Sequence, residues 1–248
     1  LVGVSMTFLG FRYRNQKLSF GEGTVVASGA WLIGTLLCAL PYYFSENCLS
    51  YLDSCFDVMS GLTTTGLCLI QNMDHLSNGI NMWRAILTFV GGQGMVVLAL
   101  TFLTKGQSSA YKMYVGEGKD EKLFPNAVST SKRIWLISLL YLAIGTVVTS
   151  ATAFQAGLAP DRAFLHGMWI FMSAWSTGGF GPMSQNVLYY HSAPLEFVTM
   201  IFFIIGSLNF ALHNAVLSGK HDELRRYIEV ITFTITLSFL TLITTFGL

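Results

Sequence analysis

The sequence predicts an all-α membrane protein made of a repeated unit: a transmembrane helix, a short re-entrant helix with a Thr/Gly turn, and a second transmembrane helix. Three observations predict this fold class. Of the 248 residues, 52% are hydrophobic and only 11% are charged, whereas a soluble domain carries about 25% charged residues. Apolar runs of about 20 residues match the length of a helical span. Shorter apolar segments, each followed by threonines and glycines, lie between these runs, and the whole pattern occurs twice.

The first unit is expected at residues 21–104. Thr24–Phe44 supplies a span, and Pro41 falls near its end, where a helix is expected to stop. Leu49–Leu62 is too short to cross a bilayer at 1.5 Å per residue. A polar return over Gln71–Asn81 leads to a second span, Trp83–Leu103.

The second unit is expected at residues 132–219, after a cytoplasmic linker at 105–131. Its spans are Lys132–Phe154 and Pro194–Leu217, and its short helix is Ala163–Trp175. Flanking segments complete the division: 1–20 is the end of a preceding helix and a cytoplasmic loop, and 220–248 is the start of a third repeat. Because the sequence starts at Leu1 and ends within an apolar run, we expect a fragment of a longer protein.

The repeat is also visible in individual residues. Four pairs of identical residues share one offset of 113: Met59 and Met172, Ser60 and Ser173, Thr64 and Thr177, Gly66 and Gly179. Gly92 and Gly206 match with one inserted residue. Since these identities coincide with the hydropathy repeat, we interpret both segments as copies of one structural unit.

Lysine and arginine set the predicted orientation. Three loops on one side hold twelve of the fourteen positive residues, and the opposite side keeps only Arg84 and Arg162. Cytoplasmic loops carry the excess of positive charge, so both Thr/Gly turns are predicted to face outside. This count treats the short helices as re-entrant.

The turns themselves indicate ion binding. Thr63, Thr64 and Thr65 precede Gly66, and such a sequence disfavours a helix. Non-helical backbone at membrane depth must be buried in protein or line a water-filled path. Backbone carbonyls beside threonine hydroxyls have the chemistry of a selectivity filter, so the predicted fold is potassium-channel-like.

Each turn would contribute one arc of carbonyl oxygens. The predicted cation ligands are Thr64, Thr65 and Gly66 in the first arc, and Thr177, Gly178 and Gly179 in the second. Gly66 and Gly179 are expected at positive φ, which glycine adopts freely. The short helices Leu52–Leu62 and Ala163–Trp175 should aim their C-termini, which carry roughly −0.5 charge, at the ion path.

Several motifs resemble the TrkH/KtrB/HKT superfamily of potassium transporters, with the TrkH branch most similar. SGLTTTGL at 60–67 resembles its first filter, and STGGF at 176–180 its second. DHL at 74–76, WR at 83–84, GGQG at 91–94, EKLFPNAVSTSKRIW at 121–135 and GSLNFALHN at 206–214 resemble other family segments. The resemblance covers nearly the whole chain.

The resemblance implies a function and partners. It implies potassium uptake or symport across the bacterial inner membrane, through a pore built from four such repeats, two of which lie here. It implies potassium as the transported ligand, no covalent cofactor, a homodimer and a cytoplasmic nucleotide-binding regulatory subunit. It extends the ion-binding set to Leu67 and Phe180 and suggests filter support by Thr63, Ser176 and Arg84. Lipid is the expected surrounding, and no nucleic acid is expected.

Three other features have open interpretations. Arg84 either supports the filter, paired with Asp74 or Asp57, or extends to lipid headgroups. Asp53 and Asp57 either add negative potential at the pore mouth or act in capping and interfacial contacts. Cys48 and Cys55 could pair only in an oxidising compartment.

Helix packing gives two further expectations. We expect interhelical hydrogen bonds from Asn209 and His213, and close helix packing at Gly91, Gly92, Gly94 and Gly206.

The sequence also bears on functions other than potassium transport. An enzyme is disfavoured, because the five histidines are scattered and form no metal-ligand motif. A non-conducting membrane subunit is one alternative, and a sodium or mixed monovalent-cation transporter is another. The residues alone do not separate potassium from sodium.

Overall fold

The computed structural model describes residues 20–45, 50–105, 127–219 and 228–246, and within these ranges every regular element is a helix. The all-α prediction is confirmed for this part of the chain. The first unit contains α2 (Phe20–Cys38), α3 (Leu40–Phe44), α4 (Tyr51–Leu62), the short 3-10 helix η1 (Met73–His75) and α5 (Asn78–Lys105).

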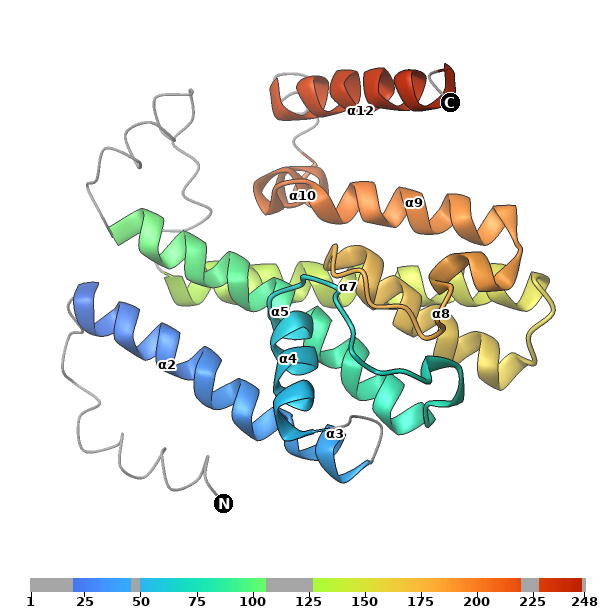
Figure 1. Ribbon diagram of the computed structural model, residues 1–248. Helices are drawn as coiled ribbons and strands as arrows, with labels where there is room; N and C mark the ends of the chain where they lie inside the picture. Colours follow the sequence, from blue (N-terminus) through green and yellow to red (C-terminus); the bar gives the residue numbers. More distant parts are fainter. Residues whose placement is uncertain (1–19, 46–49, 106–126, 220–227, 247–248) are drawn as a thin grey trace.

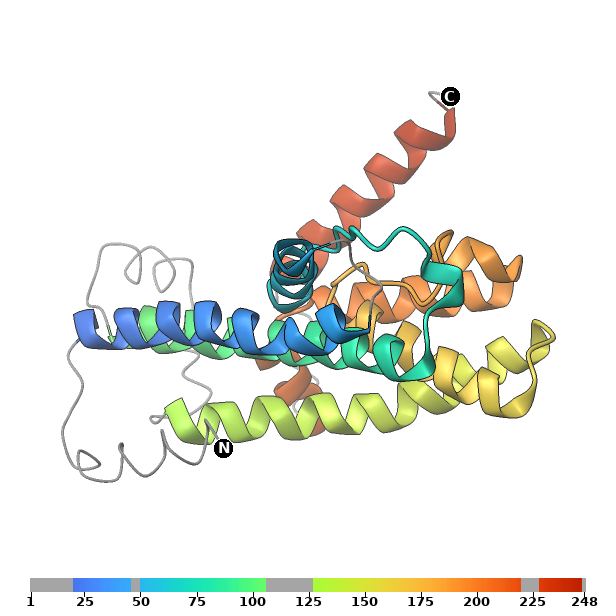
Figure 2. The ribbon, with the colours of Figure 1, turned by 60° about the horizontal axis from the view of Figure 1, so that its bottom comes forward.

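The second unit repeats this order. Its elements are α7 (Ala127–Gln155), α8 (Pro160–Trp175), the 3-10 helix η2 (Asn186–Tyr190), α9 (Ala193–Ser207) and α10 (Phe210–Leu217), and α12 (Ile228–Phe246) follows. The long helix α5 lies between α2 and α7, and α4 packs against α2 and α5 (Figures 1 and 2). The helix α12 extends away from the rest, and most of its described side chains are exposed (Figure 2).

Both short helices form close to the predicted bounds, although α8 begins three residues earlier, at Pro160. Proline is favoured in the first helical turn, where its missing N–H costs no hydrogen bond. Near Pro41, the first span is interrupted at Ala39 and continues as α3. The polar return is shorter than predicted, since α5 already begins at Asn78.

The predicted span at Pro194–Leu217 is not one continuous helix. The chain bends by 101° between α9 and α10. Asn209 stops the first helix and starts the second, because its side chain accepts a hydrogen bond from the N–H of Ala211 as an N-cap. Its counterpart α5 runs without interruption through the same region.

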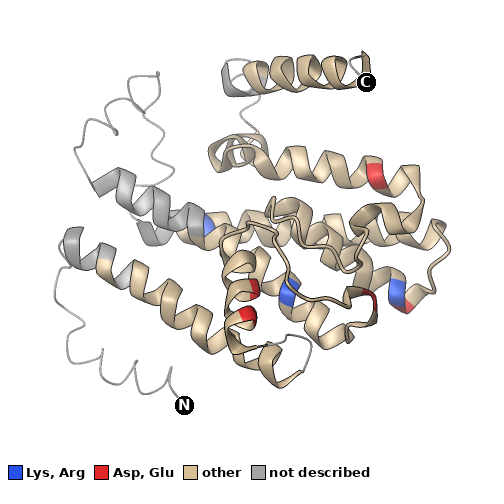
Figure 3. Cartoon of the chain, in the orientation of Figure 1, with Lys and Arg blue, Asp and Glu red and all other residues tan. Residues whose placement is uncertain are grey.

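By length and hydropathy, one described helix can cross a membrane on its own: Ser131–Gln155, with a mean hydropathy of 2.0. The bent pair of α9 and α10 passes the same test if both helices count as one span. Charged side chains are sparse along the described helices (Figure 3), as a lipid environment requires.

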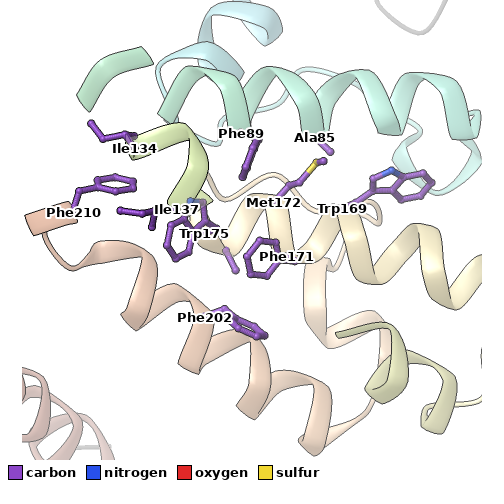
Figure 4. Close-up of a cluster of buried hydrophobic side chains, with 11 residues drawn as sticks. Ala85, Phe89, Ile134, Ile137, Trp169, Phe171, Met172, Trp175, Phe202 and Phe210 are labelled. Carbon is purple, nitrogen blue, oxygen red and sulfur yellow. The ribbon is translucent and has the colours of Figure 1, made fainter. Parts of the chain in front are cut away.

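The larger apolar core joins the two units. It comprises Ala85, Phe89, Ile134, Ile137, Trp169, Phe171, Met172, Ala174, Trp175, Phe202 and Phe210, from α5, α7, α8, α9 and α10 (Figure 4). A smaller cluster holds the first unit together: Ala39, Tyr42, Val58, Ile70, Leu76, Ile80 and Leu87. Because lipid is as apolar as these side chains, shape fit contributes more to their packing than the hydrophobic effect does.

Small residues bring each long helix close to the neighbouring short helix. A Cβ on Gly91 would lie 2.1 Å from the carbonyl oxygen of Leu62, and one on Gly206 would lie 2.3 Å from that of Trp175. Leu62 and Trp175 are the last residues of α4 and α8, 113 positions apart. By this contact Gly206 corresponds to Gly91, so the predicted match with Gly92 is wrong.

The close-packing prediction holds for three of the four glycines. A Cβ on Gly92 would lie 2.9 Å from the Cβ of Ser176, so this glycine contacts the second unit. Gly94 has room, because the nearest atom to its Cβ position is in the Trp31 ring, 3.9 Å away.

Candidate ion-binding site

Both short helices end in the same hydrogen-bonded turn. In the first, the N–H of Thr64 donates to Gly61 O at 3.1 Å, and the N–H of Thr65 donates to Ser60 O at 2.8 Å. In the second, Thr177 donates to Ala174 O at 3.1 Å, and Gly178 donates to Ser173 O at 2.9 Å. This pair of bonds is the Schellman motif, which satisfies the last carbonyls of a helix.

The predicted support residues begin each turn. Thr63 and Ser176 are the C-cap residues of α4 and α8. Their hydroxyls donate to Met59 O at 2.7 Å and to Met172 O at 2.8 Å. These matched bonds confirm the 113-residue repeat at the level of individual contacts.

The backbone takes up left-handed conformations at alternate residues. Gly66 has φ +81° and Gly179 has φ +76°, as predicted. Thr64 and Thr177 also have positive φ, 53° and 51°, which the sequence did not indicate. A β-branched residue in this region is an outlier and costs about 1–3 kcal/mol. The Schellman bonds hold both threonines in this conformation.

The structure brings the two turns into contact. A Cβ on Gly66 would lie 2.8 Å from Gly178 O and 3.3 Å from the Cα of Gly179. A Cβ on Gly179 would lie 3.5 Å from the Cα of Gly66. The two turns therefore face each other with backbone atoms, and no side chain fits between them.

One of the differences between the two turns has a steric reason. Thr65 corresponds to Gly178, and its hydroxyl lies 2.8 Å from the Thr63 hydroxyl. A Cβ on Gly178 would lie 2.2 Å from Oγ1 of Thr88, a buried residue of α5. Thr88 occupies the space in the second turn that a threonine side chain would need.

The residues that follow the glycines point in different directions. The Leu67 side chain is 58% exposed. The Phe180 ring is buried instead, and it packs against α4 at Gly61, where an added Cβ would lie 2.9 Å from the ring. Only the Phe180 backbone is therefore free to take part in ion binding.

Arg84 lies behind both turns. It is 2% exposed, so the predicted extension to lipid headgroups is wrong. Its Nη1 donates to Gly181 O at 3.1 Å, its Nη2 lies 3.4 Å from Cys68 Sγ, and its guanidinium lies 4.6 Å from the Phe180 ring centroid. A residue of the first unit thus supports the second turn.

Asp57 lies beside Arg84 in the interior. It is fully buried on α4, and Cys68 Sγ lies between its Oδ2 and Nη2 of Arg84; Figure 3 shows the acidic positions of α4 next to a basic position of α5. Oδ1 accepts from the N–H of Leu69 at 2.7 Å, and Oδ2 lies 3.5 Å from Cys68 Sγ. The capping role considered for Asp57 is therefore wrong, because its oxygens contact the segment after the first turn. Its effect on the potential at the pore mouth stays a prediction.

The other two aspartates have different partners. Asp53 is in the first turn of α4, where the Ser50 side chain accepts from its N–H at 3.1 Å and donates to its Oδ2 at 2.8 Å, which confirms the capping interpretation. Asp74 accepts from the N–H and the hydroxyl of Ser184, both at 2.8 Å, and so joins the loops that follow the two turns. These bonds lower the pKa of Asp74, and the predicted pairing of Asp74 with Arg84 is wrong.

His213 holds the bend between α9 and α10. Nε2 lies 3.1 Å from Ile205 O and Nδ1 lies 3.3 Å from the Tyr141 hydroxyl. Since a carbonyl can only accept, Nε2 carries a proton, and in the neutral ring Tyr141 donates to Nδ1. The interhelical bond is confirmed for His213. The possible pairing of Cys48 with Cys55 involves a residue outside the described ranges.

A cavity of about 360 Å³ adjoins the second turn, and its described lining comes from the second unit alone. Thr177, Gly179 and Phe180 line one wall, and the remaining lining comes from α8, η2 and α9: Ile170, Ser173, Ala174, Asn186, Val187, Thr199, Met200 and Phe203. Three lining residues, Ile170, Ala174 and Gly179, correspond at the 113 offset to Asp57, Gly61 and Gly66. In the first unit Gly61 and Gly66 contact the second turn directly.

Comparisons with known proteins agree on one family. Residues 4–247 match the TrkH family, described as a cation transport protein. The chain is 32% identical over 227 residues to the uncharacterized cation transporter MJ1485 of Methanocaldococcus jannaschii, covering 90% of this chain and 45% of that protein. It is 32% identical over 214 residues to the Trk system potassium uptake protein TrkH of Salmonella typhimurium, covering 84% of this chain and 43% of that protein.

A solved structure gives the same result. The crystal structure of the potassium transporter TrkH from Vibrio parahaemolyticus superposes with a TM-score of 0.64 at 27% identity, over 83% of this chain and 40% of that chain. The chain thus spans less than half the length of these relatives. With the family match extending over almost every residue, the chain belongs to the TrkH family of cation transport proteins.

Proposed function

We propose that this chain forms part of the ion-translocating subunit of a potassium uptake system, in which the Thr/Gly turns contribute two arcs of a selectivity filter. The observation that carries the proposal is the left-handed backbone at Thr64 and Gly66, repeated at Thr177 and Gly179. We infer that left-handed residues at alternate positions turn successive carbonyls toward the same side, whereas the peptide groups of a strand alternate. Converging carbonyls replace the hydration shell of a cation.

The short helices add a favourable field. Both end at the residue before the turn, so the partial negative charge of each C-terminus lies beside the proposed ion path. Among the described residues, no group of three or more His, Cys, Asp or Glu side chains could hold a metal ion. A filter of carbonyls and helix dipoles requires none, and it suits a monovalent cation that must leave as readily as it enters.

The cavity beside the second turn supports a ring of more than two arcs. It lies on the face of the second unit that corresponds to the face by which the first unit contacts the second turn. We propose that it receives the filter turn of a third repeat, whose first helix is α12. The divisions at 21–104, 132–219 and 220–248 are then the successive repeats of one pore.

The proposed setting follows the resemblance and the names of the relatives. The subunit would lie in the bacterial inner membrane, with the turns facing outside. It would act as a homodimer with a cytoplasmic nucleotide-binding regulatory subunit on the basic face. The loops that carry most of the positive charge lie largely outside the described residues.

Gly66→Ser tests the filter. The variant is made in the gene product that contains this chain, and uptake of potassium and sodium is measured in a bacterial strain that lacks its own potassium uptake systems. We expect the preference for potassium to fall roughly tenfold, which corresponds to about 1.4 kcal/mol, while the protein still inserts.

Gly157→Ser is the matched control. Gly157 also has positive φ, +98°, but it has open space and lies between α7 and α8, away from the turns. Serine at residue 157 would have the same kind of strained positive φ as serine at residue 66, but it would lie away from both turns. An unchanged ion preference in Gly66→Ser would refute the filter, and a sodium preference in the unmodified protein would favour the sodium alternative.

A further inference from the structure

Asp57 is a fully buried carboxylate on a helix that the proposed filter uses for its dipole. Placing a charge in such an interior is costly unless it is paired and hydrogen-bonded. Both oxygens of Asp57 have partners: Oδ1 accepts from the Leu69 N–H at 2.7 Å, and Oδ2 lies 3.5 Å from Cys68 Sγ. The carboxylate therefore fixes the chain segment that leaves the first turn.

The second unit has no carboxylate at the position that corresponds to Asp57, and a comparison of the two units gives the reason. At the 113 offset, Asp57 corresponds to Ile170 and Leu69 corresponds to Pro182. Proline has no N–H to donate, so an acceptor at residue 170 would remain without this partner. The second turn is anchored from both units instead, because Gly181 O accepts from Arg84 and Gly179 O accepts from Nδ2 of Asn186 at 3.1 Å.

Arg84 makes the buried carboxylate necessary. Its guanidinium is inaccessible to water, and Nε has no hydrogen-bond partner. Nη1 lies 3.1 Å from Gly181 O, two residues beyond Gly179. Since two residues extend the chain by at most about 7 Å, the positive charge lies within about 10 Å of the second arc. An uncompensated positive charge at that distance would repel a cation in the filter.

We propose that Asp57 is a positioning residue that neutralises Arg84 behind the filter, so that Arg84 can hold the second turn without repelling the transported cation. Cys68 lies between the two charged groups, 3.4 Å from Nη2 of Arg84. The carboxylate acts through Arg84 and through the Leu69 N–H, without contacting the ion. This inference rests on the proposed filter.

The experiment uses Asp57→Asn in the gene product that contains this chain, with the KM for potassium and the maximal rate measured separately. Asparagine can still accept from the Leu69 N–H but carries no charge. We expect the KM to rise roughly tenfold, as follows from one unit charge about 10 Å away at an effective dielectric constant of about 20. The double variant Asp57→Asn with Arg84→Gln removes both charges and should bring the KM back toward its original value.

Asp53→Asn is the matched control on the same helix. Asp53 lies one turn earlier, in the first turn of α4, and asparagine can keep the hydrogen bond to Ser50. It should leave the KM unchanged. If Asp57→Asn does not reach the membrane, restored insertion in the double variant supports charge compensation, and failed insertion in both overturns it.

An unchanged KM in Asp57→Asn would reduce Asp57 to a hydrogen-bond acceptor and overturn the inference. So would a double variant with the same raised KM as the single one. These outcomes are separable from failure of the filter itself. If Gly66→Ser alters ion preference and Asp57→Asn does not alter the KM, only the role of Asp57 is refuted.

Discussion

Gly91→Ala should displace the end of the first short helix and thereby disturb the proposed filter. The added Cβ would lie 2.1 Å from Leu62 O and 2.7 Å from Leu62 Cα. Ordinary contacts at such a position begin at 3.4 Å, so the two helices must separate by about 1 Å. The opposing atoms belong to the backbone, and no side chain rotation can relieve the contact.

The magnitude follows from overpacking, which costs about 1–3 kcal/mol in a well-packed interior. Each kcal/mol lowers the Tm of a protein of 150–250 residues by about 2–4 °C. Because Leu62 directly precedes Thr63, the shift passes to the carbonyls of the first turn. We expect a lower Tm in detergent and a weaker preference for potassium over sodium in uptake.

Gly94→Ala is the control in the same helix. A Cβ there has only the Trp31 ring within 4 Å, at 3.9 Å, and alanine is the better helix former by about 1 kcal/mol. The variant should be neutral or slightly stabilising. Equal Tm and equal ion preference in the two variants would refute the proposed contact between α5 and the end of α4.

Three further predictions follow from individual contacts. Gly178→Ala should reduce uptake because its Cβ would meet Thr88, and Thr88→Ala in the same protein should restore much of it; uptake rates at equal protein levels check this. The hydrogen bonds from Ser184 lower the pKa of Asp74. The stability that the Asp74 carboxylate contributes is therefore present above the ordinary aspartate pKa of about 3.9 and is lost as the pH falls through the lowered pKa. The Tm difference between the unmodified protein and Asp74→Asn should shrink over the same fall in pH. His213→Leu removes the side-chain donor at the bend, and a spin-label distance across α9 and α10 should broaden; an unchanged distance distribution would show that the N-cap alone holds the bend.

The repeated unit was predictable from the sequence, because composition and spacing determine it. Apolar length separates the long helices from the short ones, and the offset of 113 residues identified both turns. The positive φ of Gly66 and Gly179 was also predictable, because glycine is the residue that adopts positive φ freely.

Three features were not predictable from local sequence. Hydropathy is continuous through α9 and α10, so only the capping geometry of Asn209 reveals the bend. Thr64 and Thr177 have positive φ against the preference of β-branched residues, and the surrounding bonds impose it. The approach of Asp57 and Arg84 to the same thiol, Cys68, depends on tertiary contacts, and sequence spacing offered Asp74 as an equal candidate.

The departures from exact repetition show that the two units are adapted to each other. Gly178 replaces a threonine where Thr88 of the first unit fills the space. Pro182 has no N–H to match that of Leu69, and the neighbouring Gly181 O accepts from Arg84 of the first unit. In each case the residue missing from one unit is replaced by a contact from the other. The relative placement of the two turns is therefore encoded in their differences, and we expect exchange of one turn sequence for the other to disrupt the site even though the backbones match.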